Sequence, residues 1–196
     1  MAGADEAGRG CLAGPLVAAA VCLDLGGLSR TARRSLTGLD DSKRLTPAER
    51  RRLAAVIPLA AERVEIVICP APRIDRRGLH RCNLEALGTA LERAAAGHVA
   101  ARGPVCLVDG YSLPGCGVEH RRLVKGDSHS AAIAAASVMA KATRDGLMHR
   151  AADRLPGWGF EEHVGYGTAA HLEAITRLGV SPLHRLSFSC SAYPTA

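Results

Sequence analysis

The first ten residues of this chain gather groups that can act on a phosphate ester. Asp5 and Glu6 stand just before the glycine-flanked arginine of Gly8-Arg9-Gly10. Paired carboxylates can hold a divalent metal ion, and an arginine presents a planar fork of donors suited to phosphate. The two glycines let another molecule approach the main chain closely, because no Cβ stands in the way. The segment therefore predicts chemistry on a phosphate ester.

Two further acidic residues fall where α/β folds commonly build sites, at a strand end and before a helix. Asp109 ends the apolar segment 104–108, and Asp127 precedes a long Ala-rich segment. Carboxylates brought together repel one another unless cations neutralise them. Oxygen ligands favour Mg²⁺ or Mn²⁺ over zinc, and two such ions can clamp the attacking and leaving oxygens of a phosphodiester. We therefore predict metal-assisted hydrolysis, with these metal ligands and catalytic residues: Asp5, Glu6, Asp109 and Asp127.

Each acid also has an ordinary structural interpretation. An Asp before a helix is most often a cap, as Asp127 would be. Asp109 beside Gly110 suits a turn. Side chains alternate along a strand, so Asp5 and Glu6 point to opposite faces unless the strand ends or bends there. Spacing alone leaves both interpretations open.

The elements that must position these residues form one mixed α/β domain. A capping box is expected at Thr46 and Glu49, with Pro47 in the first helical turn. That helix should end near Pro58. The patterns predict strands at 3–6, 16–23, 62–69 and 104–108, with 118–124 as a hairpin partner of the last. Pro70 and Pro72 should end the strand at 62–69. Helices are predicted at 47–58, 84–97, 130–155 and 168–178.

The length, charge and aromatic content of the chain limit the classes of function that it can have. The chain has 196 residues, of which 47% are hydrophobic, enough for the core of a single domain. A net charge of +6 favours a polyanionic partner. Aromatic residues make up only 3%, which argues against a surface that stacks single-stranded bases and favours contact with a duplex or backbone.

The cysteine pattern and the first apolar stretch indicate the cellular compartment of the protein. Seven cysteines occur without a CxxC pair, as expected for reduced thiols rather than a zinc site or a disulfide framework. The apolar stretch 11–23 is too short to span a bilayer, and the acids that precede it do not suit a signal peptide. We expect a cytoplasmic protein with no membrane partner.

Several segments, taken in order, closely resemble the bacterial type 2 ribonucleases H, the ribonuclease HII family. The resemblance extends over about 3–188 and is specific, because many independent segments match in the same order. The matching segments are Asp5-Glu6-Ala7-Gly8-Arg9-Gly10, Asp41-Ser42-Lys43-Arg44-Leu45, Val108-Asp109-Gly110, Val124-Lys125-Gly126-Asp127-Ser128, 133–141 and His163-Val164-Gly165-Tyr166-Gly167-Thr168.

This resemblance implies an RNase H-like fold, a mixed β-sheet flanked by helices. A single catalytic domain would span 1–196, with a helical C-terminal part from about 145. The implied activity is Mg²⁺- or Mn²⁺-dependent endonucleolytic cleavage of the RNA strand in RNA/DNA hybrids and 5′ of ribonucleotides embedded in duplex DNA. The products would carry 3′-hydroxyl and 5′-phosphate ends. We expect the enzyme to act as a monomer.

The resemblance also implies roles for individual residues. Asp5, Glu6, Asp109 and Asp127 match the four catalytic acids of the family. Gly8, Arg9 and Gly10 would read the ribose 2′-hydroxyl largely through backbone groups, Tyr166 would pack on the following sugar, and Lys43 would contact a phosphate. The chain departs from many relatives at Ala7 and Val164, and neither position is one of the acids.

Other interpretations are weaker. The spacing of Gly8, Gly10 and Gly14 fails the dinucleotide-binding pattern, and no GxSxG segment for a serine hydrolase is present. The serious alternative is a non-catalytic basic module that binds RNA/DNA hybrids and whose acids are structural. Three histidines lack metal-ligand spacing, and we expect surface or loop roles for them: His163, His171 and His184.

Overall fold

The fold is built on a five-stranded mixed sheet in the order β3-β2-β1-β4-β5. The computed structural model describes residues 1–40, 42–96 and 103–193. Strand β1 is antiparallel to β2, and β2 to β3, whereas β1, β4 and β5 run parallel to one another. The strands are β1 (Ala2–Ala7), β2 (Leu16–Cys22), β3 (Arg63–Cys69), β4 (Cys106–Asp109) and β5 (His120–Leu123). The predicted mixed sheet flanked by helices is confirmed.

The pairing of β5 differs from the prediction. Segment 118–124 was expected to form a hairpin with 104–108, but β5 pairs with β4 in parallel. The segment between them, 110–119, is long enough to carry the chain back to the start of the sheet, whereas a hairpin needs only a tight turn. As a result, the carboxyl ends of β1, β4 and β5 lie at one edge. A hairpin would have directed the chain that leads to Asp127 toward the opposite edge.

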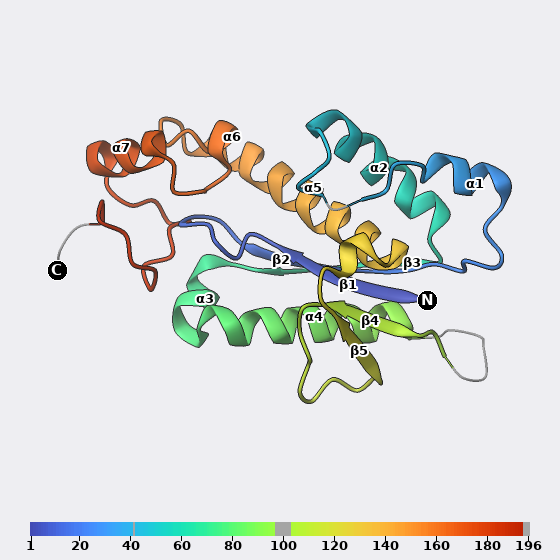
Figure 1. Ribbon diagram of the computed structural model, residues 1–196. Coiled ribbons are helices and arrows are strands. Elements are labelled where there is room, and N and C mark those ends of the chain that lie inside the picture. The colour runs from blue at the N-terminus through green and yellow to red at the C-terminus, as the bar shows by residue number, and fades with distance from the viewer. Residues whose placement is uncertain (41, 97–102, 194–196) are drawn as a thin grey trace.

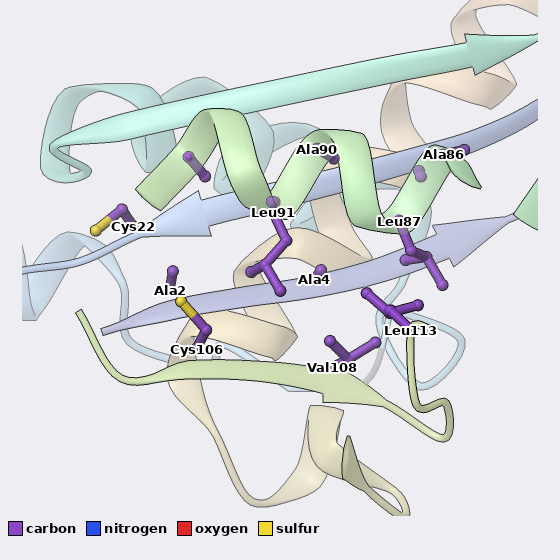
Figure 2. Packing of buried hydrophobic residues seen from close by; sticks show 13 residues of the cluster. Ala2, Ala4, Cys22, Ala86, Leu87, Ala90, Leu91, Cys106, Val108 and Leu113 are labelled. Atoms are coloured by element: carbon purple, nitrogen blue, oxygen red, sulfur yellow. The ribbon is translucent and has the colours of Figure 1, made fainter. Parts of the chain in front are cut away.

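Helices cover both faces of the sheet (Figure 1). Helix α5 (Ala131–Arg154) crosses one face, and α4 (Leu79–Ala95) lies on the other. Leu87 and Leu91 of α4 pack over Ala2 and Ala4 of β1, with Val108 of β4 beside them (Figure 2). Small residues on the inner strands let both helices approach closely, so the central strand is buried on both sides.

Six short or peripheral elements complete the fold, and one of them, α2, begins at the predicted cap Thr46. The Thr46 hydroxyl accepts the N–H of Glu49, whose carboxylate accepts the Thr46 N–H, which confirms the capping box. At α5 and α7 only the first of these two bonds is made: the Ser130 hydroxyl accepts the N–H of Ile133, and the Thr168 hydroxyl accepts that of His171. These elements are α1 (Arg30–Ser35), α2 (Pro47–Ala60), α3 (Ala71–Arg77), η1 (Gly126–Ser128), α6 (Phe160–His163) and α7 (Ala169–Leu178).

Two prolines do not act as the simple breaks that the sequence suggested. Helix α2 continues two residues past Pro58 although that ring removes one N–H donor from the helix, and the Ala61 N–H completes the last turn by donating to the Ile57 carbonyl at 2.9 Å. Pro72 ends no structure but lies in the first turn of α3, where its missing N–H is not needed. Helix α3 therefore occupies a segment that was expected only to end β3.

Two expectations from composition can be compared with the structure. All seven cysteines are free thiols, as predicted. Within the described ranges, the helices are too short or too polar for any of them to span a bilayer.

Gly3 tests the close contact between β1 and α5. A Cβ at this position would lie 2.3 Å from the backbone nitrogen of Ile133, which cannot move without shifting the helix. We expect Gly3→Ala to lower the free energy of unfolding by about 3 kcal/mol, the upper end of the usual cost of overpacking. Urea unfolding followed by circular dichroism measures this loss. The exposed Gly26→Ala should be nearly neutral, and equal effects of the two substitutions would contradict the close contact.

Candidate active site

Asp5 and Glu6 lie at the end of β1 and face opposite sides of the sheet, as strand alternation predicts. Asp5 pairs with Ala19 on the side covered by α5, where the Ser137 hydroxyl lies beside it and lowers its pKa. Glu6 pairs with Ala18 on the side of α4, where the Asn83 amide has the same effect on Glu6. The two carboxylates therefore reach the edge of the sheet from both of its faces.

Burial makes both carboxylates resist ionisation. Burial and, next, the charge of Glu6 raise the pKa of Asp5 from 3.8 to about 8. Burial also raises the pKa of Glu6 to about 7, although the Arg9 guanidinium opposes the shift. In the part of the chain that the structure describes, the Glu6 Oε2 atom is buried without a hydrogen-bond partner. A cation at this position would satisfy that oxygen and favour the ionised forms of both groups.

Asp109 joins these acids from the end of β4. Its charge raises the pKa of both Asp5 and Glu6, which places the three carboxylates within electrostatic reach of one another. The Oδ1 atom of Asp109 accepts the N–H of Gly126 at 2.7 Å. This bond holds the turn that carries Asp127 in η1 against the end of β4.

Gly126 allows that turn to pack tightly. A Cβ there would lie 2.5 Å from the Cδ1 atom of Ile133 in α5. Lys125, just before it, adopts a left-handed backbone with φ of 55°. Asp127 follows in η1 with a half-buried side chain and lines a groove with Leu36, Leu39 and other residues. Asp127 thus lies on the turn that the Asp109 side chain holds against the end of β4.

The chemistry of these donors fits a hard divalent cation. All four predicted ligands are carboxylates, and Glu6 offers a buried oxygen with no hydrogen-bond partner among the described residues. Such oxygen ligands suit Mg²⁺ or Mn²⁺. Across residues 1–40, 42–96 and 103–193, no three His, Cys, Asp or Glu side chains already lie together as a metal-binding group. An ion would therefore have to draw the carboxylates closer against their mutual repulsion.

The Gly8-Arg9-Gly10 segment turns its arginine toward the protein and exposes its backbone at Gly10. Arg9 donates a hydrogen bond to the Tyr111 hydroxyl and lies over that ring, with its Cζ atom 4.9 Å from the ring centroid. Its Nη1 atom lies 3.7 Å from Glu6 Oε1. Gly10 is exposed, and a Cβ there would meet no atom of the described residues within 4 Å. The arrangement favours close approach of a ligand to the backbone over phosphate binding by the Arg9 side chain.

Gly8 has a different role from Gly10. It adopts a φ of +92°, and a Cβ there would lie 2.1 Å from Nε of Arg144. This buried arginine of α5 donates to the carbonyls of Ala13 and Pro15 and to that of Val164. Gly8 is therefore needed for the turn itself, because it makes room for the side chain that fixes the turn.

Tyr166 lies beside this segment although it comes from the C-terminal part of the chain. The carbonyl of Gly165 accepts the N–H of Leu12 at 2.9 Å. The Tyr166 side chain is 41% exposed, and the Lys141 Nζ atom lies 5.4 Å from its ring centroid. Lys141 is itself paired with Asp145 at 2.8 Å. The structure thus brings Tyr166 next to the segment that follows Gly10.

Lys43 lies close to the acids on an exposed segment. Its charge contributes to lowering the pKa of Glu6, and its side chain is open to solvent. The preceding Ser42 is buried, and its hydroxyl oxygen accepts a hydrogen bond from the Ser137 hydroxyl at 2.9 Å. Asp41, the first residue of that motif, lies outside the described residues.

Sequence reasoning missed four residues that shape this site. Tyr111 holds Arg9, and Asn83 flanks Glu6. A possible signal for Tyr111 was its position two residues after Asp109, but nothing in the pattern distinguished Asn83 in its helix. The buried Arg144 and Arg185 were also missed. Arg185 donates to the carbonyls of Arg9 and Gly14, both at 3.0 Å, so it fixes the backbone around Gly10.

The interpretation of three histidines as surface residues is wrong, although His184 does lie on a segment outside the helices and strands. His163, His171 and His184 are buried together around Phe160. Each imidazole makes hydrogen bonds to backbone groups or to another imidazole, which offsets the cost of burying it. Their separation along the sequence concealed the cluster, because α7 and the segment after it bring these residues together.

Comparison with known proteins gives one family. A family model described as Ribonuclease HII matches residues 2–191. A Ribonuclease HII of Geobacillus kaustophilus is 46% identical over 191 residues, which make up 96% of this chain and 68% of that protein. One from Mycobacterium avium is 46% identical over 188 residues, covering 96% and 77%. One from Salinispora arenicola is 45% identical over 188 residues, and this chain spans 66% of its length.

Solved structures share the fold. The Archaeoglobus fulgidus RNase HII, determined in complex with PCNA, superposes with a TM-score of 0.77 at 24% identity, covering 96% of this chain and 95% of that chain. A Bst-RNase HIII bound to Mn²⁺ also gives a TM-score of 0.77, at 20% identity, covering 96% of this chain and 66% of that chain. At these identities the similarity establishes the RNase H-like fold.

The raised pKa values predict how stability depends on pH in the absence of metal. Between about pH 4 and pH 8 the folded chain holds protons on Asp5 and Glu6 that the unfolded chain has released. Their contribution to the free energy of unfolding therefore falls as the pH rises through this range. In EDTA, urea unfolding should show this decline, and Asp5→Asn should flatten it. The exposed Asp153→Asn serves as the control, and an unchanged slope in Asp5→Asn would contradict the raised pKa.

Proposed function

The chain belongs to the ribonuclease HII family of nucleases, and from this membership we propose that it hydrolyses the RNA strand of RNA/DNA hybrids and cuts 5′ of ribonucleotides embedded in duplex DNA. The products would carry 3′-hydroxyl and 5′-phosphate ends. The observation that carries the proposal is the juxtaposition of the buried Asp5 and Glu6 carboxylates with the exposed backbone at Gly10. The carboxylates suit phosphodiester chemistry, and the exposed backbone suits close approach of a sugar.

The acidic residues supply the reactive centre in this proposal. Mg²⁺ or Mn²⁺ would be held by Asp5, Glu6, Asp109 and Asp127. When bound, two such ions would activate water and neutralise charge on the attacking and leaving oxygens. The chain's own contribution is to keep Asp5 and Glu6 buried within electrostatic reach of Asp109, which fixes the turn that carries Asp127 through its bond with Gly126.

Recognition of the substrate is assigned to neighbouring groups. Backbone groups of Gly8, Arg9 and Gly10 would contact the 2′-hydroxyl, which distinguishes a ribose from a deoxyribose. Tyr166 would pack on the next sugar, and its partly exposed ring suits that contact. Lys43 would contact a phosphate, since its exposed ammonium lies near the acids. The net charge of +6 favours binding of the polyanionic duplex.

The setting of the reaction is also part of the proposal. One chain supplies all the proposed catalytic and recognition groups, so we propose that the enzyme acts as a monomer. Its seven free thiols suit a reducing compartment, and we propose the cytoplasm.

Cleavage of a duplex with one embedded ribonucleotide tests the activity. The purified chain should cut 5′ of the ribonucleotide only when Mg²⁺ or Mn²⁺ is added. Asp109→Asn should lower kcat by roughly 10²–10³-fold, the usual cost of removing one group that stabilises charge in the transition state. Gel mapping of the products measures both effects, with Asp153→Asn as the control. Retained cutting in Asp109→Asn would contradict the catalytic role of Asp109, whereas no metal-dependent cutting by the parent chain would favour a module that only binds hybrids.

Gly10 provides a test of ribose recognition that leaves the fold intact. Among the residues that the structure describes, no atom lies within 4 Å of an added methyl group, so Gly10→Ala should fold with near-normal stability. The same methyl group would keep a sugar from approaching the backbone. We expect cleavage of the embedded ribonucleotide to fall by about 10²-fold, the scale of a misplacement of about 1 Å. Binding to an all-DNA duplex should change little, and equal losses in cleavage and binding would argue against a sensing role.

A further inference from the structure

The backbone on both sides of the Tyr166 α-carbon is held by buried imidazoles. The N–H of Gly165, one peptide before Tyr166, donates to Nδ1 of His163 at 3.1 Å. The carbonyl of Tyr166 lies 2.9 Å from Nδ1 of His171. His171 is fully buried, and His163 is 8% exposed. Tyr166 is therefore a partly exposed side chain on a backbone that is fixed from inside the protein.

The hydrogen bonds determine which nitrogen of each ring carries its proton. The N–H of Ser181 donates to Nδ1 of His184 at 2.8 Å, so the proton of His184 is on Nε2. That Nε2 lies 3.1 Å from Nε2 of His171, which must then accept. His171 consequently carries its proton on Nδ1 and donates it to the Tyr166 carbonyl. The bonds run in one direction, from Ser181 through two imidazoles to Tyr166.

This order of donors and acceptors requires that the imidazoles of His171 and His184 be uncharged. A second proton on His171 would place two N–H groups opposite each other across the contact with His184. Burial lowers the pKa of His171 to about 4 and also lowers that of His184, which keeps both rings neutral near pH 7. The cluster therefore has a fixed arrangement of donors and acceptors at neutral pH.

Packing holds the rings in place. His163 stacks on His171 with ring centroids 4.1 Å apart, and Phe160 meets His171 edge to face with centroids 5.7 Å apart. The Nε2–H of His163 donates to the carbonyl of Trp158 at 2.7 Å. The imidazoles are thus fixed by contacts on several sides and can in turn fix the loop.

The loop needs such support because its backbone is strained. Val164 adopts a left-handed conformation with φ of 43°, which is uncommon for a β-branched residue. Gly165 follows with φ of +88°, and a Cβ there would lie 2.3 Å from the carbonyl oxygen of Ala13. A relaxed loop would move Tyr166 away from the segment after Gly10.

We propose that His171, supported by His163 and His184, is a positioning residue that sets Tyr166 for recognition of the sugar. This inference rests on the proposed role of Tyr166 in the nuclease. The imidazole touches no substrate in this scheme and acts only through the Tyr166 backbone. Substrate selection at the surface then depends on a hydrogen-bonded cluster inside the C-terminal part of the chain.

Two amide substitutions separate this role from general stability. The side-chain amide of His171→Asn can donate from near the Nδ1 position and preserve the bond to Tyr166. His171→Gln places its amide near the Nε2 position and loses that bond. We expect kcat/KM for a duplex with one ribonucleotide to fall about tenfold in His171→Gln, the scale of one lost hydrogen bond, and less than about threefold in His171→Asn. Thermal unfolding midpoints, with the exposed His149→Gln as a control, show how stable each variant is.

A double-mutant cycle with Tyr166→Ala decides whether His171 acts through Tyr166. The double variant Tyr166→Ala with His171→Gln should cleave no more slowly than Tyr166→Ala alone, because the group being positioned is gone. Additive losses, or equal losses in the Asn and Gln variants, would overturn the inference while leaving the nuclease proposal standing. Unchanged kcat/KM in Tyr166→Ala, in a chain that cuts normally, would overturn the role of Tyr166 and the inference with it. No cutting by the parent chain would instead refute the proposed function.

Discussion

The structure depends on the burial of two adjacent carboxyl groups at the end of one central strand. Asp5 and Glu6 are adjacent in β1, and burial together with the charges of Glu6 and Asp109 raises the pKa of Asp5 well above its ordinary value. This arrangement costs free energy unless a cation offsets it. The packing of α4 and α5 on the two faces of the sheet stabilises the fold and offsets this cost. The two carboxyl groups are therefore held rigidly at a position where a cation would stabilise their ionised forms.

The topology then determines which other acids can join this pair. Parallel pairing of β1, β4 and β5 brings their carboxyl ends to one edge. Asp109 ends β4 there, and its bond to Gly126 holds the beginning of η1. Residues more than a hundred positions apart thus share one electrostatic environment. The order of the strands matters more for this site than the details of any single loop.

Recognition is built differently from the reactive centre. The carboxylates come from strand ends, whereas the exposed backbone at Gly10 and the ring of Tyr166 lie on irregular segments. Buried polar side chains hold those segments: Arg185 binds the carbonyl of Arg9, and His171 binds that of Tyr166. Internal hydrogen bonds take the place of regular secondary structure here. A precise surface can therefore form where the local backbone is strained.

Much of this protein could be predicted from local patterns. The capping box at Thr46 and the apolar strands follow from short-range chemistry, which a sequence displays directly. Asp5 and Glu6 were expected to face opposite sides of a strand, and they do. The parallel pairing of β5, the partnership of Arg9 with Tyr111 and the histidine cluster could not be predicted. Each depends on contacts between segments distant in sequence, so the sequence determined the elements and the chemical groups, and only tertiary packing decided which groups meet.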